Sequence, residues 1–197
     1  MNGAGKSSIG GHLLQQAGLS WFNPDTFARE LRAVTGCSQE EANSAAWQEG
    51  LRRLDDAIAQ GRSHAFETTL GGRTLAARIA TATRSHDVLV WFCGLSSPEL
   101  HIARVKARVA AGGHSIPEDR IRERFPAVME NLIALMPYLT QLQIYDNSVE
   151  AAHGKSVPDP VLLAHMEAGK LVSPTDVRAL MQTPEWAKPL LEAALSI

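Results

Sequence analysis

The sequence begins with Met1-Asn2-Gly3-Ala4-Gly5-Lys6-Ser7-Ser8, which is its strongest indication of a fold class. It matches the second half of the phosphate-binding motif G-x-x-x-x-G-K-S, whose small residues let backbone N–H groups turn inward around a phosphate. Lys6 has the place of the lysine that reaches the outer phosphates, and Ser7 has that of the hydroxyl that holds Mg²⁺. A glycine-rich tail is the weaker alternative. The stretch predicts that ATP or GTP, with Mg²⁺, binds at Asn2, Gly3, Ala4, Gly5, Lys6, Ser7 and Ser8.

The strand that should precede this loop is the first feature outward from it. In such folds a buried apolar strand in the middle of a parallel sheet delivers the loop. That strand and the first glycine of the motif would both lie before Met1. We therefore expect the first central strand to be missing from the printed sequence, with Met1 an internal residue of the loop. Because unpaired sheet edges aggregate, we expect this chain to be poorly soluble or to bind ATP weakly.

Composition indicates an ordinary globular protein. The 197 residues are 45% hydrophobic and 20% charged, with a formal net charge of −2. This charge gives no global field that favours nucleic acid or an anionic membrane, so neither is an expected partner. Cys37 and Cys93 are expected to be packing residues in a reduced, cytoplasmic protein. No apolar run has the length of a membrane span.

Helical and strand patterns alternate through most of the chain, which predicts a three-layer α/β fold of the P-loop kinase type, with a parallel sheet. Apolar runs predict strands over residues 19–23, 64–68, 88–93 and 141–147, the last of these closing the sheet. The continuous apolar run 88–93 predicts a strand covered on both faces. Capping boxes are expected at Ser38 with Glu41 and at Ser115 with Glu118, each opening a long helix.

We expect the chain to divide into a core and an appendage. The core spans residues 1–148 and includes a helical lid over 104–124, and residues 149–160 form a surface loop. Residues 161–197 form a C-terminal appendage packed on the core, with a short strand at 170–172 and a helix from Ser173-Pro174. Trp186 is expected to pack there, without a role in a site.

Acidic residues follow two of the expected strands. Asp25, after Asn23-Pro24, and Glu67, before Thr68, would lie at carboxyl ends of strands, where open sheets bind ligands. A carboxylate there can accept a proton from an incoming hydroxyl, as kinase aspartates do. The structural alternatives are that Asp25 only caps a helix and that Glu67 is only a polar strand end.

A basic stretch is the candidate lid. Arg104 and Arg108 are four residues apart and share a helix face, and Arg120, Arg122 and Arg124 follow a glycine hinge. Phosphoryl transfer needs positive charge at the moving phosphoryl group, which a closing lid could supply. Arg108 and Arg124 are the first candidates and Arg120 the next, whereas Lys106 and Arg122 fit a solvated face. His114 would contact phosphate or cap the turn.

Taken together, these segments resemble the zeta-toxin family of P-loop kinases, in the subgroup called predicted ABC-type ATPases, although the chain has no ABC signature. The resemblance covers about three quarters of the chain. It rests on residues 2–8, Asn23-Pro24-Asp25, Phe66-Glu67-Thr68-Thr69-Leu70, the block Arg104–Glu118, Asn131-Leu132 and Tyr145-Asp146-Asn147-Ser148.

The resemblance implies a phosphotransferase that uses ATP or GTP, whose best-known relatives phosphorylate the 3′-hydroxyl of UDP-N-acetylglucosamine. It implies that Lys6 holds the phosphates, Ser7 the Mg²⁺, and Asp25 the hydroxyl proton. Asn23, Glu67, Thr68 and His114 would bind substrate. Arg108 would clamp phosphate, with Arg120 or Arg124 in place of the family's second arginine.

A kinase that acts on a small-molecule hydroxyl is therefore the expected function, and a toxin of this kind would have an antitoxin protein as partner. The alternative is a nucleotide-dependent switch or binding protein without an acceptor. A switch has no need of a carboxylate opposite the γ-phosphate, so Asp25 discriminates between the two.

Overall fold

The computed structural model describes residues 3–6, 10, 14, 20–149 and 158–197. Residues 1–5, 69–83 and 87–197 form one compact unit, here called the sheet unit. Residues 6–68 and 84–86 form a second, here called the helical unit. Within the described residues, no helix combines the length and the apolar character that a membrane span requires.

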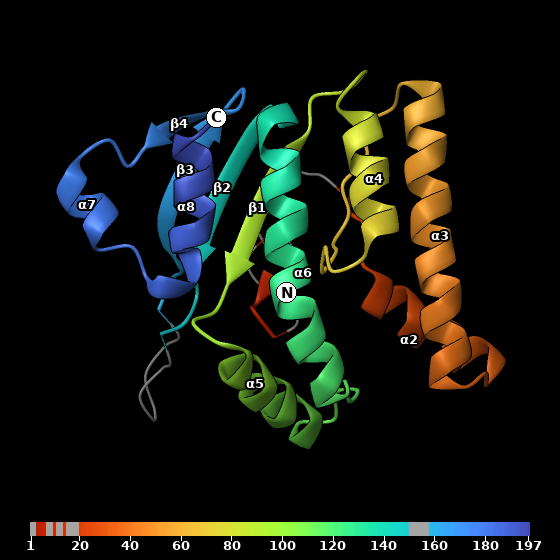
Figure 1. Ribbon diagram of the computed structural model, residues 1–197. Coiled ribbons are helices and arrows are strands. Elements are labelled where there is room, and N and C mark those ends of the chain that lie inside the picture. The colour runs from red at the N-terminus through yellow and green to blue at the C-terminus, as the bar shows by residue number, and fades with distance from the viewer. Residues whose placement is uncertain (1–2, 7–9, 11–13, 15–19, 150–157) are drawn as a thin grey trace. The chain divides into compact units, whose positions relative to one another are not determined.

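The helical unit contains two capped helices, α2 (Pro24–Thr35) and α3 (Gln39–Gln60) (Figure 1). The expected capping box of α3 is confirmed: the Ser38 side chain accepts from the Glu41 N–H, and the Glu41 carboxylate accepts from the Ser38 N–H. Small side chains let the two helices approach, and their shared core consists of Ala28, Ala42 and Ala46, with Phe27, Leu31 and Cys37 packed against it.

The strands expected at 19–23 and 64–68 are reduced, in the described residues, to one parallel bridge between Phe22 and Phe66. The Phe22 N–H donates to the Ala65 carbonyl and the Glu67 N–H to the Phe22 carbonyl, both at 2.9 Å. Pro24 already begins α2 and has no N–H to extend the ladder. The strand prediction is therefore too long here, although the parallel pairing that it implied is present.

The sheet unit is built on four strands in the order β1-β2-β3-β4 (Figure 1). The strands are β1 (Leu89–Gly94), β2 (Gln141–Asp146), β3 (Val161–Glu167) and β4 (Lys170–Ser173). β1 and β2 pair in parallel, as expected, whereas β3 and β4 add antiparallel to the far side of β2. The expectation that the strand after Thr140 is the last one is therefore wrong.

A tight turn makes this extension of the sheet possible. Ala168 and Gly169 both have positive φ, 47° and 74°, as the turn between two strands of a hairpin requires. The strand expected at 170–172 is confirmed as β4, and β3 was missed. Residues 161–173 of the expected appendage thus belong to the sheet itself.

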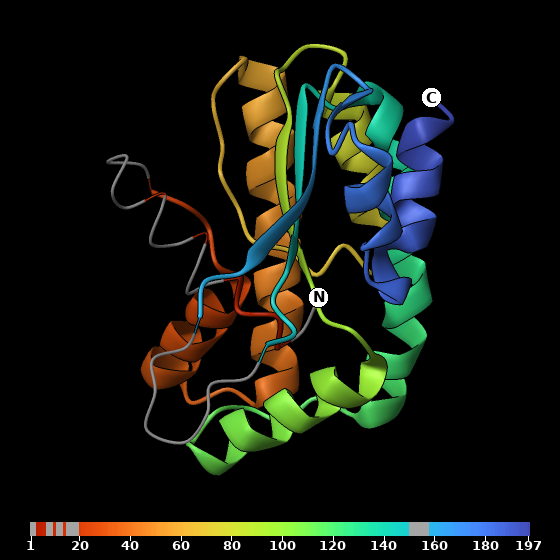
Figure 2. The ribbon, with the colours of Figure 1, turned by 90° about the vertical axis from the view of Figure 1, so that its left-hand side faces the viewer.

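Helices cover one face of the sheet in this unit. Figures 1 and 2 show α6 and α8 side by side along that face, with α5 near the end of β1. The helical elements of the unit are α4 (Arg73–Ala82), α5 (Pro98–Ala110), α6 (Glu118–Leu135), η1 (Met136–Tyr138), α7 (Val177–Met181), η2 (Glu185–Ala187) and α8 (Lys188–Leu195).

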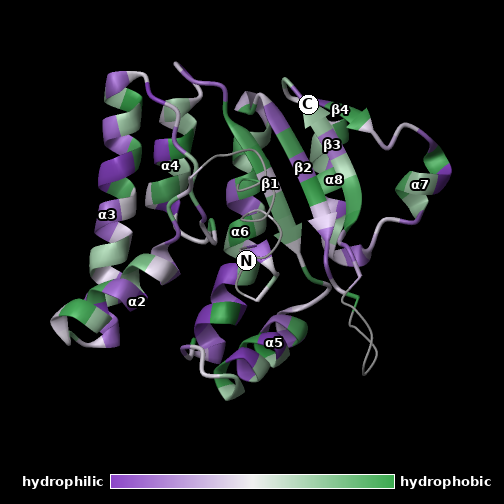
Figure 3. Ribbon diagram, turned by 180° about the vertical axis from the view of Figure 1, so that it is seen from behind, coloured by the Kyte–Doolittle hydropathy of each residue, from purple (hydrophilic) through white to green (hydrophobic). Residues whose placement is uncertain are grey.

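β1 is predominantly hydrophobic (Figure 3), yet it is not covered along its whole length. Phe92 is buried, whereas Leu89 and Trp91 are 58% and 42% exposed. The two exposed side chains alternate with the buried one, as the period of a strand demands. The prediction of a strand covered on both faces is therefore wrong for the first half of β1.

Two helix starts differ from the expectation. Pro117, and not Ser115, precedes α6, and the Glu118 carboxylate pairs with Lys106 Nζ at 2.7 Å, so the second capping box is absent. The helix expected from Ser173-Pro174 starts at Val177, where the Asp176 side chain accepts from the Ala179 N–H. Only a side chain that directly precedes the first turn can reach its N–H groups.

Trp186 packs in the core of the sheet unit, as expected. It is 7% exposed, and its ring lies 6.4 Å from that of Phe92, centroid to centroid. A Cβ added at Gly94 would lie 2.3 Å from the indole, so the last residue of β1 must be glycine for this packing.

Candidate functional site

The phosphate loop begins in the sheet unit, where Gly3 and Gly5 adopt left-handed φ values of 70° and 79°. Glycine takes this conformation without the steric cost that a Cβ carries. A Cβ at Gly3 would also lie 3.3 Å from the His101 carbonyl oxygen and 3.4 Å from Arg104 Cβ on α5. The loop backbone therefore packs closely on α5, and the conformation fits the inward turn of N–H groups that phosphate binding requires.

The residue between these glycines is anchored from two strand ends. Ala4 is fully buried, and its carbonyl oxygen accepts from Cys93 Sγ at 2.9 Å and from Asn147 Nδ2 at 3.0 Å. Cys93 belongs to β1, and Asn147 directly follows β2. Cys93 is thus a buried packing residue, as expected, that also contacts the loop.

The remaining loop residues are only partly described. Lys6, Gly10 and Leu14 have helical backbone. The predicted nucleotide-binding residues Asn2, Ser7 and Ser8 lie outside the described residues. Their roles, including that of Ser7 toward Mg²⁺, stay predictions.

In the helical unit, Glu67 connects two of the predicted site residues. Its Oε1 lies 3.3 Å from Lys6 Nζ, and its Oε2 accepts from Asn23 Nδ2 at 3.1 Å. The side chains of Lys6 and Glu67 are only 18% and 15% exposed. The carboxylate is therefore a counter-charge for the loop lysine, and residues 44 and 61 positions apart in the sequence meet in one cluster.

Asn23 also settles how α2 begins. Its Oδ1 accepts from the N–H groups of Asp25 and Thr26 at 2.9 and 3.2 Å, so Asn23 is the helix cap. The alternative in which Asp25 is only a cap is therefore wrong. Asp25 lies exposed in the first turn of α2, where a negative charge is favoured by the helix dipole. Thr68 follows Glu67 and is half-buried.

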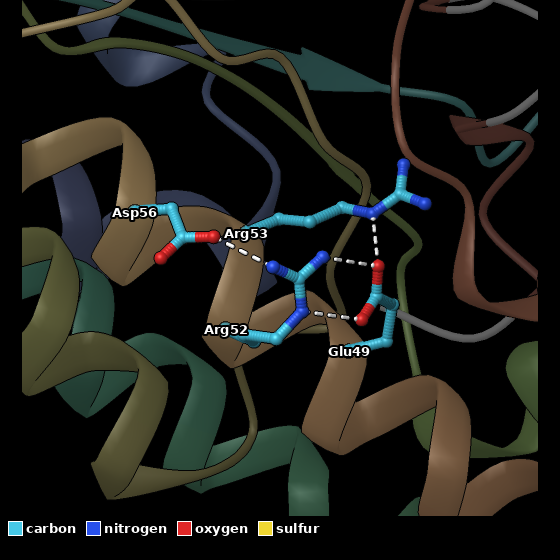
Figure 4. A network of polar contacts seen from close by, with 4 residues as sticks. All are labelled: Glu49, Arg52, Arg53 and Asp56. Carbon is cyan, nitrogen blue, oxygen red and sulfur yellow. Dashed lines mark hydrogen bonds and ion pairs between the residues drawn. The ribbon is translucent and has the colours of Figure 1, made fainter. Parts of the chain in front are cut away.

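A charged network on α3 contacts Phe22, the residue that precedes Asn23. Glu49 binds Arg52 and Arg53, and Arg52 also binds Asp56 (Figure 4). Hydrogen bonds from the two arginines lower the pKa of Glu49 to about 2. Arg53 in turn lies over the Phe22 ring, 4.7 Å from its centroid. The network is thus connected, through Arg53, to the Phe22 ring.

The predicted lid arginines belong to the sheet unit, and the structure distinguishes among them. Arg108 is half-buried, and its Nη2 donates to the His114 carbonyl at 3.3 Å. A Cβ at Gly113 would lie 2.8 Å from Arg108 Cγ, so the glycine lets this arginine fold back on the turn. Arg108 and His114 are therefore brought together, His114 through its backbone.

Arg124 and Arg120 differ in their surroundings. Arg124 is half-buried and packs along Gly71, where an added Cβ would lie 3.0 Å from its Cγ. Arg120 is exposed and lies 3.6 Å from Glu123. The position of Arg124 is therefore more restricted by packing than that of Arg120.

The other basic residues of the stretch are engaged with acids at the surface. Arg122 pairs with Glu99, and Lys106 pairs with Glu118. Each contact lowers the pKa of its carboxyl group, chiefly through a side-chain hydrogen bond. Both basic residues fit the solvated face that was expected of them.

Sequence reasoning missed Arg104 and Asn131 as contacts of the site segments. Arg104 packs against Gly3, and its Nη2 donates to the Val149 carbonyl at 3.2 Å. Asn131 Nδ2 donates at 2.8 Å to the carbonyl of Leu70, in the segment that follows Thr68. The spacing of Arg104 to Arg108 indicated a shared helix face but not its contacts, and nothing local to Asn131 indicates its partner.

No cluster of three or more His, Cys, Asp or Glu side chains that could hold a metal is present among the described residues. Mg²⁺ at a phosphate loop does not require one, because phosphate oxygens, a hydroxyl and waters supply most of its ligands. The assignment of Mg²⁺ to Ser7 therefore stays a prediction.

Sequence comparisons place the chain among known protein families. The family model AAA_33, described as an AAA domain, matches residues 1–132. A protein of Haemophilus influenzae (strain ATCC 51907 / DSM 11121 / KW20 / Rd), described as uncharacterized, is 37% identical over 70 residues. That match covers 35% of this chain and 50% of the relative, so the chain spans half the length of that relative.

Among solved structures, the fold is similar to the crystal structure of AvrRxo1-ORF1:AvrRxo1-ORF2 with sulphate ions. The TM-score is 0.61 at 15% identity, covering 99% of this chain and 73% of the other. The predicted α/β fold of the P-loop kinase type is thereby confirmed. With the family model spanning most of the chain, including the loop, the protein belongs to the AAA_33 family of P-loop nucleotide-binding domains.

Proposed function

We propose that this protein is a phosphotransferase of the zeta-toxin type, which transfers the γ-phosphoryl group of ATP or GTP to a hydroxyl of a small molecule. One observation carries the proposal: Glu67 holds Lys6 and Asn23, while Asn23 caps the helix whose first turn carries Asp25. The loop lysine and two carboxylates are thus linked within the helical unit. A protein that only binds a nucleotide has no need of a carboxylate at the position of Asp25.

In the proposed reaction the nucleotide phosphates replace Glu67 as the partner of Lys6. The Glu67 carboxylate, with Thr68, then accepts hydrogen bonds from the acceptor molecule. Asp25 takes the proton of the attacking hydroxyl as that oxygen bonds to the γ-phosphorus and the bond to the β-phosphate oxygen breaks. Mg²⁺, held by Ser7, would neutralise charge on the phosphates.

The lid arginines would stabilise the charge of the transferring group. Arg108 and Arg124 are the first candidates, because both are half-buried and packed against a glycine. Arg120 is the third candidate. His114 would bind the acceptor or the phosphate. Guanidinium groups suit this task because their planar fork matches phosphate oxygens.

The acceptor class rests on the family resemblance. A nucleotide sugar, such as a UDP-N-acetyl sugar, is the first candidate, in a cytoplasmic setting. An antitoxin protein is a proposed partner, and the similar structure supports it only in so far as that structure contains two named proteins.

The test is phosphorylation of nucleotide sugars and other small hydroxyl compounds with MgATP and MgGTP. Asp25→Asn should lower acceptor phosphorylation at least 100-fold, because a general base contributes about 10²–10⁴-fold. Lys6→Ala should abolish turnover. Asp119→Asn is the matched control, since Asp119 is also an exposed acid in the first turn of a helix, α6.

Unchanged phosphorylation in Asp25→Asn would remove Asp25 as the base. Nucleotide binding and hydrolysis without transfer to any acceptor, insensitive to Asp25, would instead identify a nucleotide-dependent switch.

A further inference from the structure

The carbonyl of Ala4 is the best-anchored group of the described phosphate loop. It lies in a fully buried residue and accepts two side-chain donors, Cys93 Sγ at 2.9 Å and Asn147 Nδ2 at 3.0 Å. Asn147 is itself only 8% exposed, and its own N–H donates to the Gly94 carbonyl at 3.1 Å. The donor is therefore held by the end of β1 while it holds the loop.

Peptide geometry links this anchor to the phosphate site. The Ala4 carbonyl and the Gly5 N–H belong to one peptide unit, and in a trans peptide the two groups point in opposite directions. A carbonyl fixed toward the ends of β1 and β2 therefore directs the Gly5 N–H away from them. In a phosphate loop that direction is the concave side, where N–H groups meet the anion.

We infer that Asn147 and Cys93 are positioning residues for nucleotide binding, which lock the Ala4–Gly5 peptide so that the Gly5 N–H is preset toward the phosphates. The inference rests on the proposed function only in so far as the loop binds a nucleotide. It gives a role to Asn147, which belongs to the motif Tyr145-Asp146-Asn147-Ser148 but not to the proposed reaction.

The two donors make different contributions. An amide N–H is a strong donor, whereas a thiol is a weak one. Loss of Asn147 should therefore matter more than loss of Cys93, and a hydroxyl at position 93 should keep the contact. A carboxylate at position 147 would place a second acceptor against the Ala4 oxygen and should reverse the interaction.

The test compares variants of the whole chain by calorimetric titration with MgATP and with adenosine. Asn147→Ala should weaken MgATP binding by about three- to tenfold, the value of one hydrogen bond. Asn147→Asp should weaken it further, and Cys93→Ala less, with Cys93→Ser closer to the original protein than Cys93→Ala. Adenosine binding should not change, because it makes no phosphate contacts.

Asn131→Ala is the matched control. It also removes a side-chain amide that donates to a backbone carbonyl, but that carbonyl belongs to Leu70 and not to the phosphate loop. It should leave MgATP affinity unchanged. A second readout needs no nucleotide: hydrogen exchange of the Gly5 amide in the free protein should be faster in Asn147→Ala and unchanged in Asn131→Ala.

Equal MgATP affinity and equal Gly5 exchange in Asn147→Ala would overturn the inference, as would equal losses for MgATP and adenosine. Failure of the proposed function is a different result. A protein that binds MgATP, loses affinity in Asn147→Ala and phosphorylates no acceptor would refute the proposed phosphotransferase. It would still support the positioning role of Asn147.

Discussion

The Glu67 carboxylate contacts two other predicted site residues, Lys6 and Asn23. Its Oε1 pairs with Lys6 and its Oε2 accepts from Asn23, so both carboxylate oxygens are engaged. Lys6 must leave this partner before it can bind phosphate. The ion pair therefore opposes nucleotide binding by about 1 kcal/mol, the upper end of the range for exposed pairs, because both side chains are largely buried.

A neutral residue at position 67 should separate the two roles of this carboxylate. In Glu67→Gln the amide oxygen can still accept from Asn23, but Lys6 loses its counter-charge. We expect MgATP affinity to rise by up to about fivefold, the equivalent of 1 kcal/mol. Transfer to the acceptor should fall at least tenfold, because Glu67 would bind the acceptor.

Calorimetry and transfer kinetics measure the two effects separately. Glu30→Gln, at an exposed position of α2, should change neither. A Glu67→Gln protein with weaker MgATP binding and full transfer activity would contradict both assignments.

Among the elements, the end of β1 contacts both the phosphate loop and the Trp186 ring. Cys93 contacts the loop, and Gly94 lies against the Trp186 ring, which itself has no hydrogen-bond partner for its buried indole nitrogen among the described residues. A change in this packing would displace the strand end and, with it, the contact to Ala4.

Gly94→Ala should therefore destabilise the protein by about 1–3 kcal/mol, the usual cost of overpacking. The added methyl group would lie 2.3 Å from the indole and force the ring to move. The free energy of unfolding in urea measures the effect. Trp186→Phe should cost less in the Gly94→Ala background than alone, because the smaller ring leaves room for the methyl group.

Additive costs of the two substitutions would show that Gly94 and Trp186 do not interact in solution.

Elements that depend on local signals were predicted well, for example α3, whose capping box lies within four residues of sequence. β3 was not, because its pairing with β2 is a long-range contact that an apolar run alone does not specify.

For the whole molecule, the proposed activity has a consequence for cells. A kinase that consumes a nucleotide sugar should arrest bacterial growth when it is expressed, and Asp25→Asn should remove the arrest. Growth curves after induction, with equal protein levels checked by immunoblot, measure this. Asp119→Asn should remain as toxic as the original protein.

Normal growth at high levels of active enzyme would exclude the toxin and favour a metabolic kinase with a dispensable acceptor. Growth arrest that persists in Asp25→Asn would show that toxicity does not depend on transfer.

The phosphate loop, the class of fold and the start of α3 could be predicted from the sequence alone. These depend on glycines, caps and apolar periods whose physical causes act within a few residues. The sequence also selected Lys6, Asp25 and Glu67 as a related set, because residues after strands gather at one sheet edge.

The side chains that hold Ala4 and Glu67 could be identified only from the three-dimensional structure. Asn147 and Cys93 reach Ala4 across 143 and 89 positions of sequence, and Asn23 caps α2 while it binds Glu67. Such contacts depend on strand register and on the path of the chain between elements. No local preference specifies them, because the free energy of each contact exists only once the sheet and its helices have brought the partners together.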